Sequence, residues 1–391
     1  MTNAKKESPV LVRITTVPIS LKVLLKGQMK FMKSNGFEVI MISDDGPEVD
    51  ALVEQEGCEH ITTKLTRKIT PLQDLISLIK LTGILKKINP DIVHTHTPKA
   101  GLIGMWAAYF ARVPVRLHTI AGLPWVESDG LLKKILIAVE KCTAFPAHAV
   151  FPNSKKQMAF LKEHGIAKNK MNVLGHGSSN GINLNFFSPN DIIKAQGEAL
   201  KEKSRLKSGG WIWVFVGRVV KDKGIAELLT AFDQVVTQYP NDQLWLVGNM
   251  ETNLDPLDEK DMRMIHEHEN IIWWDYQQDV RPFLLASDVL TFPSYREGFP
   301  NVPLQAAALD CMLILSNING CNEIVEDGVN GMLVEPKSSK ALTDAMFFAR
   351  NNPDIKLQMT EKIRQKIRTH YNQETLWGLL LEEYRKRIQR N

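Results

Sequence analysis

The feature that most constrains the fold of this chain is a repeated alternation of short apolar runs with longer amphipathic segments. In the first part of the sequence the apolar runs are VLVRITTV, FEVIMIS and DIVHTH, and the segments between them carry apolar residues at helical spacing. The same alternation starts again after residue 205 with WIWVFVG, QLWLVG, IIWWDY, DVLTFPS and MLILS. Strands that alternate with helices in this way form parallel sheets covered by helices. The chain is therefore predicted to be an α/β protein with two such sheets.

The segment between the two alternations, GHGSSNGINLNFFSPN at residues 175–190, is rich in Gly, Ser and Asn and is predicted to be a hinge. A chain of 391 residues is also longer than one core usually supports. We therefore predict two Rossmann-like, doubly wound domains over residues 1–182 and 183–370. Residues 371–391 have a helical pattern after the second alternation ends, and we expect this helix to pack back toward the first domain.

Composition excludes several classes of protein. The formal net charge of +4 is small for this length, which argues against a dedicated nucleic-acid binder. The four cysteines stand far apart without a C-x-x-C pair, which disfavours a zinc site or a disulfide framework and predicts a reducing, cytoplasmic compartment. The N-terminal apolar run is interrupted by Arg13 and is too short for a signal peptide, and no later run is long enough to span a membrane.

Two basic residues follow a predicted strand in VFVGRVVKDKG, residues 214–224. Arg218 and Lys223 stand just before a helix, where they could neutralise the oxygens of a departing diphosphate. The alternative is a pair of solvated cations, because Lys and Arg are common at such positions. No G-x-G-x-x-G opens either domain, which disfavours a nicotinamide cofactor.

A second stretch, SYREGFPNVPLQAAALDC at residues 294–311, places Glu297 in a loop before a small-residue helix. We expect Asn301 to cap that helix, with Pro303 in its first turn. Free backbone amides there would hold phosphate while the carboxylate accepts hydrogen bonds from sugar hydroxyls, as a nucleotide sugar requires. An ordinary surface loop is the alternative. The predicted donor-binding residues of these two stretches are Arg218, Lys223, Gly298, Phe299, Pro300, Asn301 and Val302.

These stretches, with NGCNEIVEDGVNGMLVEP, resemble the donor half of the retaining glycosyltransferases of family 4, which have the GT-B fold. In the first domain, TTVPIS, KGQMKFM, HTHTPKAGLIG and VPVRLHTIAGL resemble members that build bacterial surface polysaccharides, often on polyprenyl-diphosphate carriers. The resemblance covers nearly the whole chain. It implies a hexosyltransferase whose two domains face each other across a cleft. Its donor would be a nucleotide sugar, most simply UDP-linked, its acceptor a glycan or lipid-linked glycan, and it would need no metal.

The resemblance also assigns individual residues. Glu297 matches the first acid of the family's E-x7-E element, which contacts the donor sugar, and Gln305 stands where a second glutamate usually grips the ribose. The neutral amide should lower donor affinity by about 1 kcal/mol. Asp310 replaces a usual glycine and is expected to tolerate a left-handed conformation. The predicted catalytic residues are His118, Glu297, Arg218 and Lys223, with no protein nucleophile.

Other positions in the first domain are interpreted more simply. His118 is taken to end the strand VPVRLH and to point toward the cleft, although a lone histidine is often structural. His94 and His96 share one face of a strand and lack a third ligand, so we expect them to line the strand end rather than hold a metal. Lys99 could meet an acceptor phosphate. The family's glycine-rich loop after the first strand is represented only by Gly27.

Lysines recur at helical spacing in residues 21–35, and LLKKILIAVEKC adds three more. The first set is expected to form one stripe of a single helix, which is either merely solvated or rests on anionic lipid as a peripheral membrane contact. These four residues are Lys22, Lys26, Lys30 and Lys33.

Two other functions stay open at this point. Gln305 would suit a nucleotide-sugar-binding protein that has lost turnover, and a nucleotide-sugar epimerase can share the GT-B fold.

Overall fold

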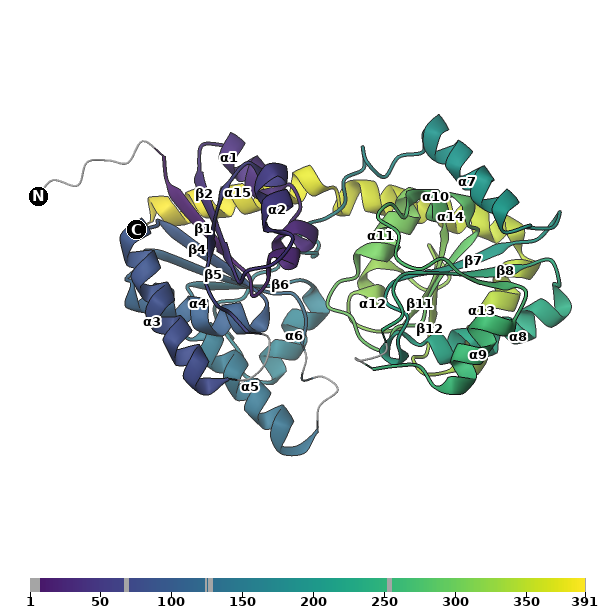
Figure 1. The fold of residues 1–391 in the computed structure, drawn as a ribbon, viewed down its shortest axis with the longest axis horizontal. Coiled ribbons are helices and arrows are strands. Elements are labelled where there is room, and N and C mark those ends of the chain that lie inside the picture. The colour runs from purple at the N-terminus through teal and green to yellow at the C-terminus, as the bar shows by residue number, and fades with distance from the viewer. Residues whose placement is uncertain (1–7, 67–69, 124, 126–128, 252–254, 391) are drawn as a thin grey trace, which may run out of the picture. The chain divides into compact units, whose positions relative to one another are not determined.

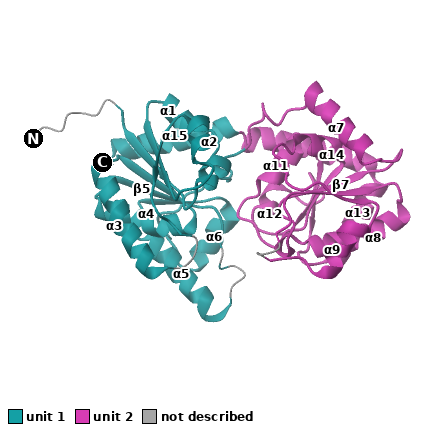
Figure 2. Cartoon of the chain, in the orientation of Figure 1, with its two compact units in different colours: residues 1–181, 373–391 teal, residues 182–372 magenta. Residues whose placement is uncertain are grey.

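The computed structural model describes residues 8–66, 70–123, 125, 129–251 and 255–390. The first seven residues, which belong to the N-terminal stretch considered above, lie outside this range. The chain divides into two compact units, unit 1 with residues 1–181 and 373–391, and unit 2 with residues 182–372 (Figure 2). The predicted division fell after residue 182, and the chain returns to unit 1 after residue 372. Each unit contains a six-stranded sheet in which all recorded strand pairs are parallel, which confirms the predicted fold class.

Unit 1 has the strand order β3-β2-β1-β4-β5-β6. Its strands are β1 (Val10–Ile14), β2 (Glu38–Ser43), β3 (Glu59–Thr62), β4 (Ile92–His96), β5 (Val115–Ile120) and β6 (Ala149–Pro152). Its helices are α1 (Gln28–Ser34), α2 (Val49–Glu56), α3 (Pro71–Ile88), α4 (Pro98–Phe110), α5 (Gly130–Ala144), α6 (Lys155–Glu163) and α15 (Gln373–Gln389). Helices α3, α4 and α5 cover one face of the sheet, and α1, α2 and α15 cover the other (Figure 1). Because the strands are parallel, each helix that connects two of them begins at the carboxyl edge of the sheet.

The C-terminal helix α15 is part of the core of unit 1. Leu380, Leu381 and Tyr384 pack among the buried residues of β1, β2 and α1. The Tyr384 hydroxyl accepts a hydrogen bond from the buried Arg13 guanidinium at 2.5 Å and lies 2.6 Å from His94 Nδ1. The helix thus supplies both apolar cover and a polar partner to the sheet.

Unit 2 has the strand order β12-β11-β10-β7-β8-β9. Its strands are β7 (Ile212–Val216), β8 (Gln243–Val247), β9 (Ile271–Trp273), β10 (Val289–Phe292), β11 (Met312–Ser316) and β12 (Met332–Val334). Its helices are α7 (Asp191–Lys203), α8 (Ile225–Gln238), α9 (Glu259–Glu267), α10 (Arg281–Ala286), α11 (Asn301–Ala308), α12 (Cys321–Ile324), α13 (Ser339–Asn351) and α14 (Pro353–His370). The central strands β7, β10 and β11 are buried throughout, as expected of a sheet covered on both faces.

The expected stripe of four lysines on a single helix is wrong. Residues Ser20–Leu24 form a separate π-helical turn, and α1 begins only after Gly27, whose φ of 82° interrupts the helix. A Cβ on Gly27 would lie 2.7 Å from Trp377 Cη2, so the lack of a side chain lets this residue pack closely against α15. Among the described helices, none combines the length and apolar character needed to cross a bilayer.

Candidate functional site

The candidate site lies in unit 2, where the strand order reverses. Strand β7 is flanked by β10 on one side and by β8 on the other, so the chain runs from β7 to β8 and β9 on one side and then crosses over to β10 on the other. In open parallel sheets the loops at such a switch point diverge and leave room for a ligand beyond the carboxyl ends of the strands. Here these loops lead from β7 into α8 and from β10 into α11.

The loops after β7 and β10 touch through their backbones. Gly224 has a φ of 70°, and a Cβ at this position would lie 2.2 Å from the carbonyl oxygen of Pro293. Only glycine fits such a close approach without strain. The Tyr295 amide also donates to the Asp222 carbonyl at 2.9 Å, so the two loops are held in one register.

The contact between these two loops brings two of the predicted site residues together. Lys223 Nζ lies 2.7 Å from Glu297 Oε1, and the two side chains are only 14% and 18% exposed. The buried Ser294 hydroxyl donates to the same carboxylate oxygen at 3.0 Å. A cation and an anion 74 positions apart in the sequence are thus held together at the switch point, partly shielded from water.

The other predicted cation does not join this pair. Arg218 Nη1 lies 3.0 Å from Glu251 Oε2, an acid in the loop after β8, and the arginine side chain is 46% exposed. The structure therefore places Arg218 and Lys223 in separate ion pairs. Because the Arg218 side chain is half exposed, it can turn away from Glu251 at small energetic cost.

The cap predicted for α11 is wrong. Asn301 is the first helical residue, and the N-cap is Pro300, whose φ of −76° and ψ of 132° are extended. Phe299 is buried and packs on the Tyr371 ring at 5.3 Å. Proline has no side-chain acceptor, so no side-chain hydrogen bond caps the helix, and its first amides can face an anion.

Most side chains of α11 are buried in the core of unit 2. Leu304 is fully buried, while Val302 and Gln305 are partly exposed. Among the described residues, the structure records no hydrogen bond for the Gln305 side chain.

After the helix, Asp310 has the expected left-handed conformation with a φ of 64°, and its carboxylate pairs with Arg364 at 2.7 Å. That prediction is confirmed.

Several residues at this edge were missed from the sequence. Ser294 binds the carboxylate of Glu297, and Asp222 pairs with Arg296 at 3.3 Å. Burial raises the pKa of the Cys321 thiol, and the negative charge of Glu297 raises it further. Ser294 could have been noticed because it also follows a buried strand and stands three residues before Glu297.

In unit 1, the prediction that His118 ends its strand is wrong, because β5 continues to Ile120 through pairing with β4 and β6. The His118 ring is 2% exposed and lies under α4, where a Cβ on Gly101 would be 2.4 Å from its Cε1 atom. Its Nδ1 is 2.8 Å from the Thr95 hydroxyl. Burial lowers the pKa of His118 to about 4, so the ring is neutral at pH 7. Its role in transfer stays a prediction.

The other histidines and Lys99 are placed as follows. His94 is buried, with its Nε2 2.8 Å from the Thr119 hydroxyl, and it lines a small cavity together with His96, Pro152 and Asn153, in agreement with the expected strand-end lining. This cavity has a volume of about 10 Å³, which fits a single water. Lys99 pairs with Asp74 at 2.6 Å. No group of three or more His, Cys, Asp or Glu in the described ranges could hold a metal ion.

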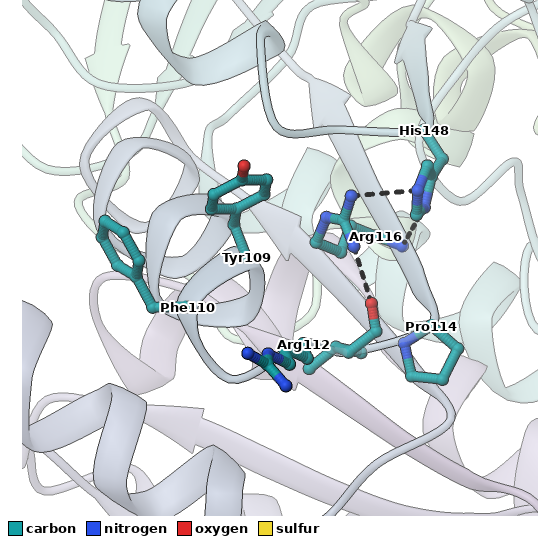
Figure 3. Close-up of a pocket in the computed structure, with 7 residues that line it drawn as sticks. Tyr109, Phe110, Arg112, Pro114, Arg116 and His148 are labelled. Carbon is teal, nitrogen blue, oxygen red and sulfur yellow. Dashed lines mark hydrogen bonds between the residues drawn. The ribbon is translucent and has the colours of Figure 1, made fainter.

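A larger cavity of about 530 Å³ lies where strands β5 and β6 begin, at the amino edge of the unit 1 sheet (Figure 3). The Arg116 guanidinium on its wall donates to the carbonyls of Pro146 and Val113 at 2.7 Å each and lies 2.9 Å from His148 Nε2. Burial and the neighbouring Arg116 lower the pKa of His148 to about 4. Arg116 thus ties two turns together, and this cavity carries none of the predicted site residues.

Comparisons with known proteins bear on both units. Residues 196–367 match the family described as glycosyl transferases group 1, and residues 26–177 match a glycosyl transferase 4-like domain. The chain is 31% identical to the capsular polysaccharide biosynthesis glycosyltransferase CapM of Staphylococcus aureus over 92% of its own length and 93% of that protein.

A second relative is the UDP-Gal:alpha-D-GlcNAc-diphosphoundecaprenol alpha-1,3-galactosyltransferase of Escherichia coli, which is 28% identical over 92% of this chain and 94% of that protein. Among solved structures, Anabaena HepE in complex with UDP-glucose matches with a TM-score of 0.81 and 16% identity, covering 96% of this chain and 99% of HepE. The structural likeness confirms the two-domain GT-B fold.

Proposed function

We infer that this chain, which belongs to the group 1 glycosyltransferases of bacterial polysaccharide synthesis, takes its sugar from a UDP-linked donor bound by unit 2. The observation that carries this inference is the shielded ion pair between Lys223 and Glu297 at the switch point of the unit 2 sheet. A cation at this position suits a diphosphate, and a carboxylate beside it suits sugar hydroxyls.

Each part of the donor would be bound by the residues whose chemistry suits it. Lys223 and the uncapped amides of α11 would hold the diphosphate, since both carry positive charge. Glu297 would accept hydrogen bonds from the sugar, and Gln305, farther along α11, from the ribose. Arg218 would join after leaving Glu251. Ser294 would keep the Glu297 carboxylate oriented through its 3.0 Å hydrogen bond.

In the transfer step the bond between the anomeric carbon and the diphosphate breaks, and negative charge develops on the leaving oxygens. Lys223 would stabilise that charge. The family transfers with retention, so the acceptor hydroxyl would attack from the face that the diphosphate leaves. The protein then contributes position and charge rather than a covalent intermediate. These cationic groups would let the reaction proceed without a metal ion, and transfer in the presence of EDTA tests this point.

We propose that the acceptor is a glycan precursor carried on a polyprenyl diphosphate. The support comes from the Escherichia coli relative, whose name specifies a diphosphoundecaprenol-linked acceptor and whose length is matched almost completely. Work on such an acceptor would place the protein at the inner face of the plasma membrane.

The test is incubation with single UDP-sugars, with and without a polyprenyl-diphosphate-linked sugar, followed by mass analysis and NMR of the product's anomeric centre. The proposal predicts a mass gain of one hexose or hexosamine on the acceptor, with the donor's anomeric configuration. Isomerised donor without transfer would instead show an epimerase, and donor binding without product would show a protein that lacks turnover. Either result contradicts the proposal.

A further inference from the structure

We infer that the cavity at the amino edge of the unit 1 sheet binds an anionic sugar, that is, a sugar that carries a phosphate or a carboxylate. The cavity lies where β5 and β6 begin, and its volume of about 530 Å³ is typical of small-molecule sites. The inference is independent of the donor site proposed for unit 2, because that site is at the carboxyl edge of a different sheet.

Two N–H donors meet at this cavity without an acceptor between them. The Arg116 amide lies 3.2 Å from His148 Nδ1, and the guanidinium Nη2 of the same arginine lies 2.9 Å from His148 Nε2 (Figure 3). A neutral imidazole has one N–H and one acceptor nitrogen, so it cannot accept from both Arg116 groups. If Nδ1 accepts from the amide, Nε2 carries the proton and stands as a donor beside Nη2. An oxygen atom of an anion would accept from both.

The charges around His148 also favour an anion. Burial lowers the pKa of His148, positive charges add to this effect, and the ring is neutral at pH 7, with a pKa of about 4. These charges are those of Arg116, Arg387 and Lys170. Arg387 pairs with Glu383 at 2.6 Å, whereas Arg116 and Lys170 form no ion pair among the described residues. A bound phosphate or carboxylate would supply the missing negative charge.

The Arg116 guanidinium is both fixed in place and able to bind a ligand. It donates to the carbonyls of Pro146 and Val113 at 2.7 Å each, in addition to its contact with His148. A guanidinium has five N–H groups, and no further partner of this one is found in the described part of the chain. The two carbonyls therefore hold the planar fork while its other N–H groups remain for an anion.

Arg112 borders the same cavity in an uncommon backbone conformation. It follows α4 with a φ of 58°, in the left-handed region where glycine or asparagine is more usual. Its side chain is exposed, and among the described residues the structure records no hydrogen bond or ion pair for it. A charged side chain that is kept at a cavity by an unfavourable conformation indicates a role in binding.

Aromatic side chains on the cavity wall suit the ring of a sugar. Tyr109 and Phe110, in the last turn of α4, are 45% and 50% exposed. Figure 3 shows these two rings on one side of the cavity and His148 on the other. The Arg116 Cζ atom lies 5.5 Å from the centre of the Tyr109 ring, so the cation and the aromatic surface adjoin. The apolar face of a sugar can pack on such a ring while its charged group meets the arginine.

The experiment measures binding of glucose 1-phosphate, glucuronate, glucose and inorganic phosphate to the full-length protein by calorimetry and saturation-transfer NMR. We expect glucose 1-phosphate or glucuronate to bind, with saturation transferred to the protons of the sugar ring, and the anion that binds identifies the charged group. Glucose should bind at least about tenfold more weakly, because it lacks the charge-assisted hydrogen bonds. Inorganic phosphate should also bind more weakly, because it lacks the ring.

The test variant is Arg112→Asn, since asparagine tolerates the left-handed conformation. Its matched control is Arg205→Asn, because Arg205 is also exposed and follows a helix, α7, with a φ of 56°. Arg112→Asn should weaken binding of the anionic sugar about tenfold, and the control should bind like the parent. Arg116→Lys keeps the charge but loses the planar fork and should also weaken binding, with thermal melting to check its fold.

A last variant, Lys223→Met, separates this cavity from the donor site of unit 2 and should leave binding of the anionic sugar at the cavity unchanged. The inference is overturned if neither anionic sugar binds, or if the Arg112 and Arg205 variants bind equally. It is also overturned if inorganic phosphate binds as tightly as glucose 1-phosphate, which would show a site for a bare anion. Loss of binding in Lys223→Met but not in Arg112→Asn would assign the sugar to unit 2 and would equally overturn it.

Discussion

The ion pair between Lys223 and Glu297 predicts opposite effects when its two members are changed. In the unliganded protein the lysine is held by the carboxylate at 2.7 Å. If the diphosphate of the donor binds Lys223, it must compete with Glu297 for that cation. Glu297→Gln should therefore tighten UDP binding while slowing transfer, and Lys223→Met should weaken UDP binding and slow transfer.

The magnitudes follow from the geometry. Two unit charges 2.7 Å apart attract by about 6 kcal/mol at an effective dielectric constant of 20, and desolvation of these partly buried groups offsets most of it. A charge-assisted hydrogen bond retains about 1.5–3 kcal/mol, so Lys223→Met should weaken UDP binding roughly 10- to 100-fold. A neutral amide holds the lysine less strongly by about 1 kcal/mol, so Glu297→Gln should tighten UDP binding roughly fivefold.

Calorimetric titration with UDP measures the affinities, and initial transfer rates measured on the same preparations complete the test. Asp344→Asn is the control, because it breaks an exposed pair with Lys340 on α13, also 2.7 Å long, and should change neither quantity. If both members of the Lys223–Glu297 pair shift UDP affinity in the same direction, or if neither does, the pair holds the fold and not the donor.

Three further predictions concern single residues. Burial raises the pKa of Glu140 to about 7 from an ordinary value of 4.5, so the folded state keeps a proton that the unfolded state releases. The contribution of Glu140 to stability should therefore fall by about 3 kcal/mol as pH rises from 4.5 through 7, while buried His118, with its lowered pKa, contributes in the opposite direction. The difference in stability between the parent and Glu140→Gln should change by that amount in melting curves measured over this pH range. Gly101→Ala should destabilise unit 1 because the methyl group would meet the His118 ring, whereas Gly83→Ala, in open space on α3, should stabilise by about 0.5–1 kcal/mol, as urea titration would show. Gln305→Glu should tighten UDP binding up to about tenfold in calorimetry if this side chain meets the ribose, and an unchanged affinity would remove it from the site.

Periodicity predicted the sheets, because buried parallel strands are continuous apolar runs and their crossover helices are amphipathic. It also placed Lys223 and Glu297 at strand ends. The ion pair they form depends on β7 and β10 being neighbours, and strand order is a tertiary property that a local pattern does not contain. For the same reason, the sequence did not show that Arg218 faces Glu251.

Other differences arise from local conformations that tertiary packing decides. The lysines near the N-terminus have helical spacing, yet Gly27 adopts a left-handed conformation against Trp377 of α15, a residue 350 positions away. His118 was taken to end the strand VPVRLH, yet β5 continues to Ile120 through pairing with both neighbours. Asn301 is a good capping residue, yet the extended Pro300 before it already occupies the cap.

The central claim is that the loops after β7 and β10 hold the donor diphosphate, and hydrogen exchange measured by mass spectrometry tests it most directly. Backbone amides that bind phosphate, or that become buried beside it, exchange more slowly. With saturating UDP, we predict slower exchange in peptides covering residues 217–227 and 294–308, and unchanged exchange in a peptide covering α13, on the same unit. Protection confined to unit 1, or no protection of either loop at a UDP concentration that calorimetry shows to be saturating, would contradict the account.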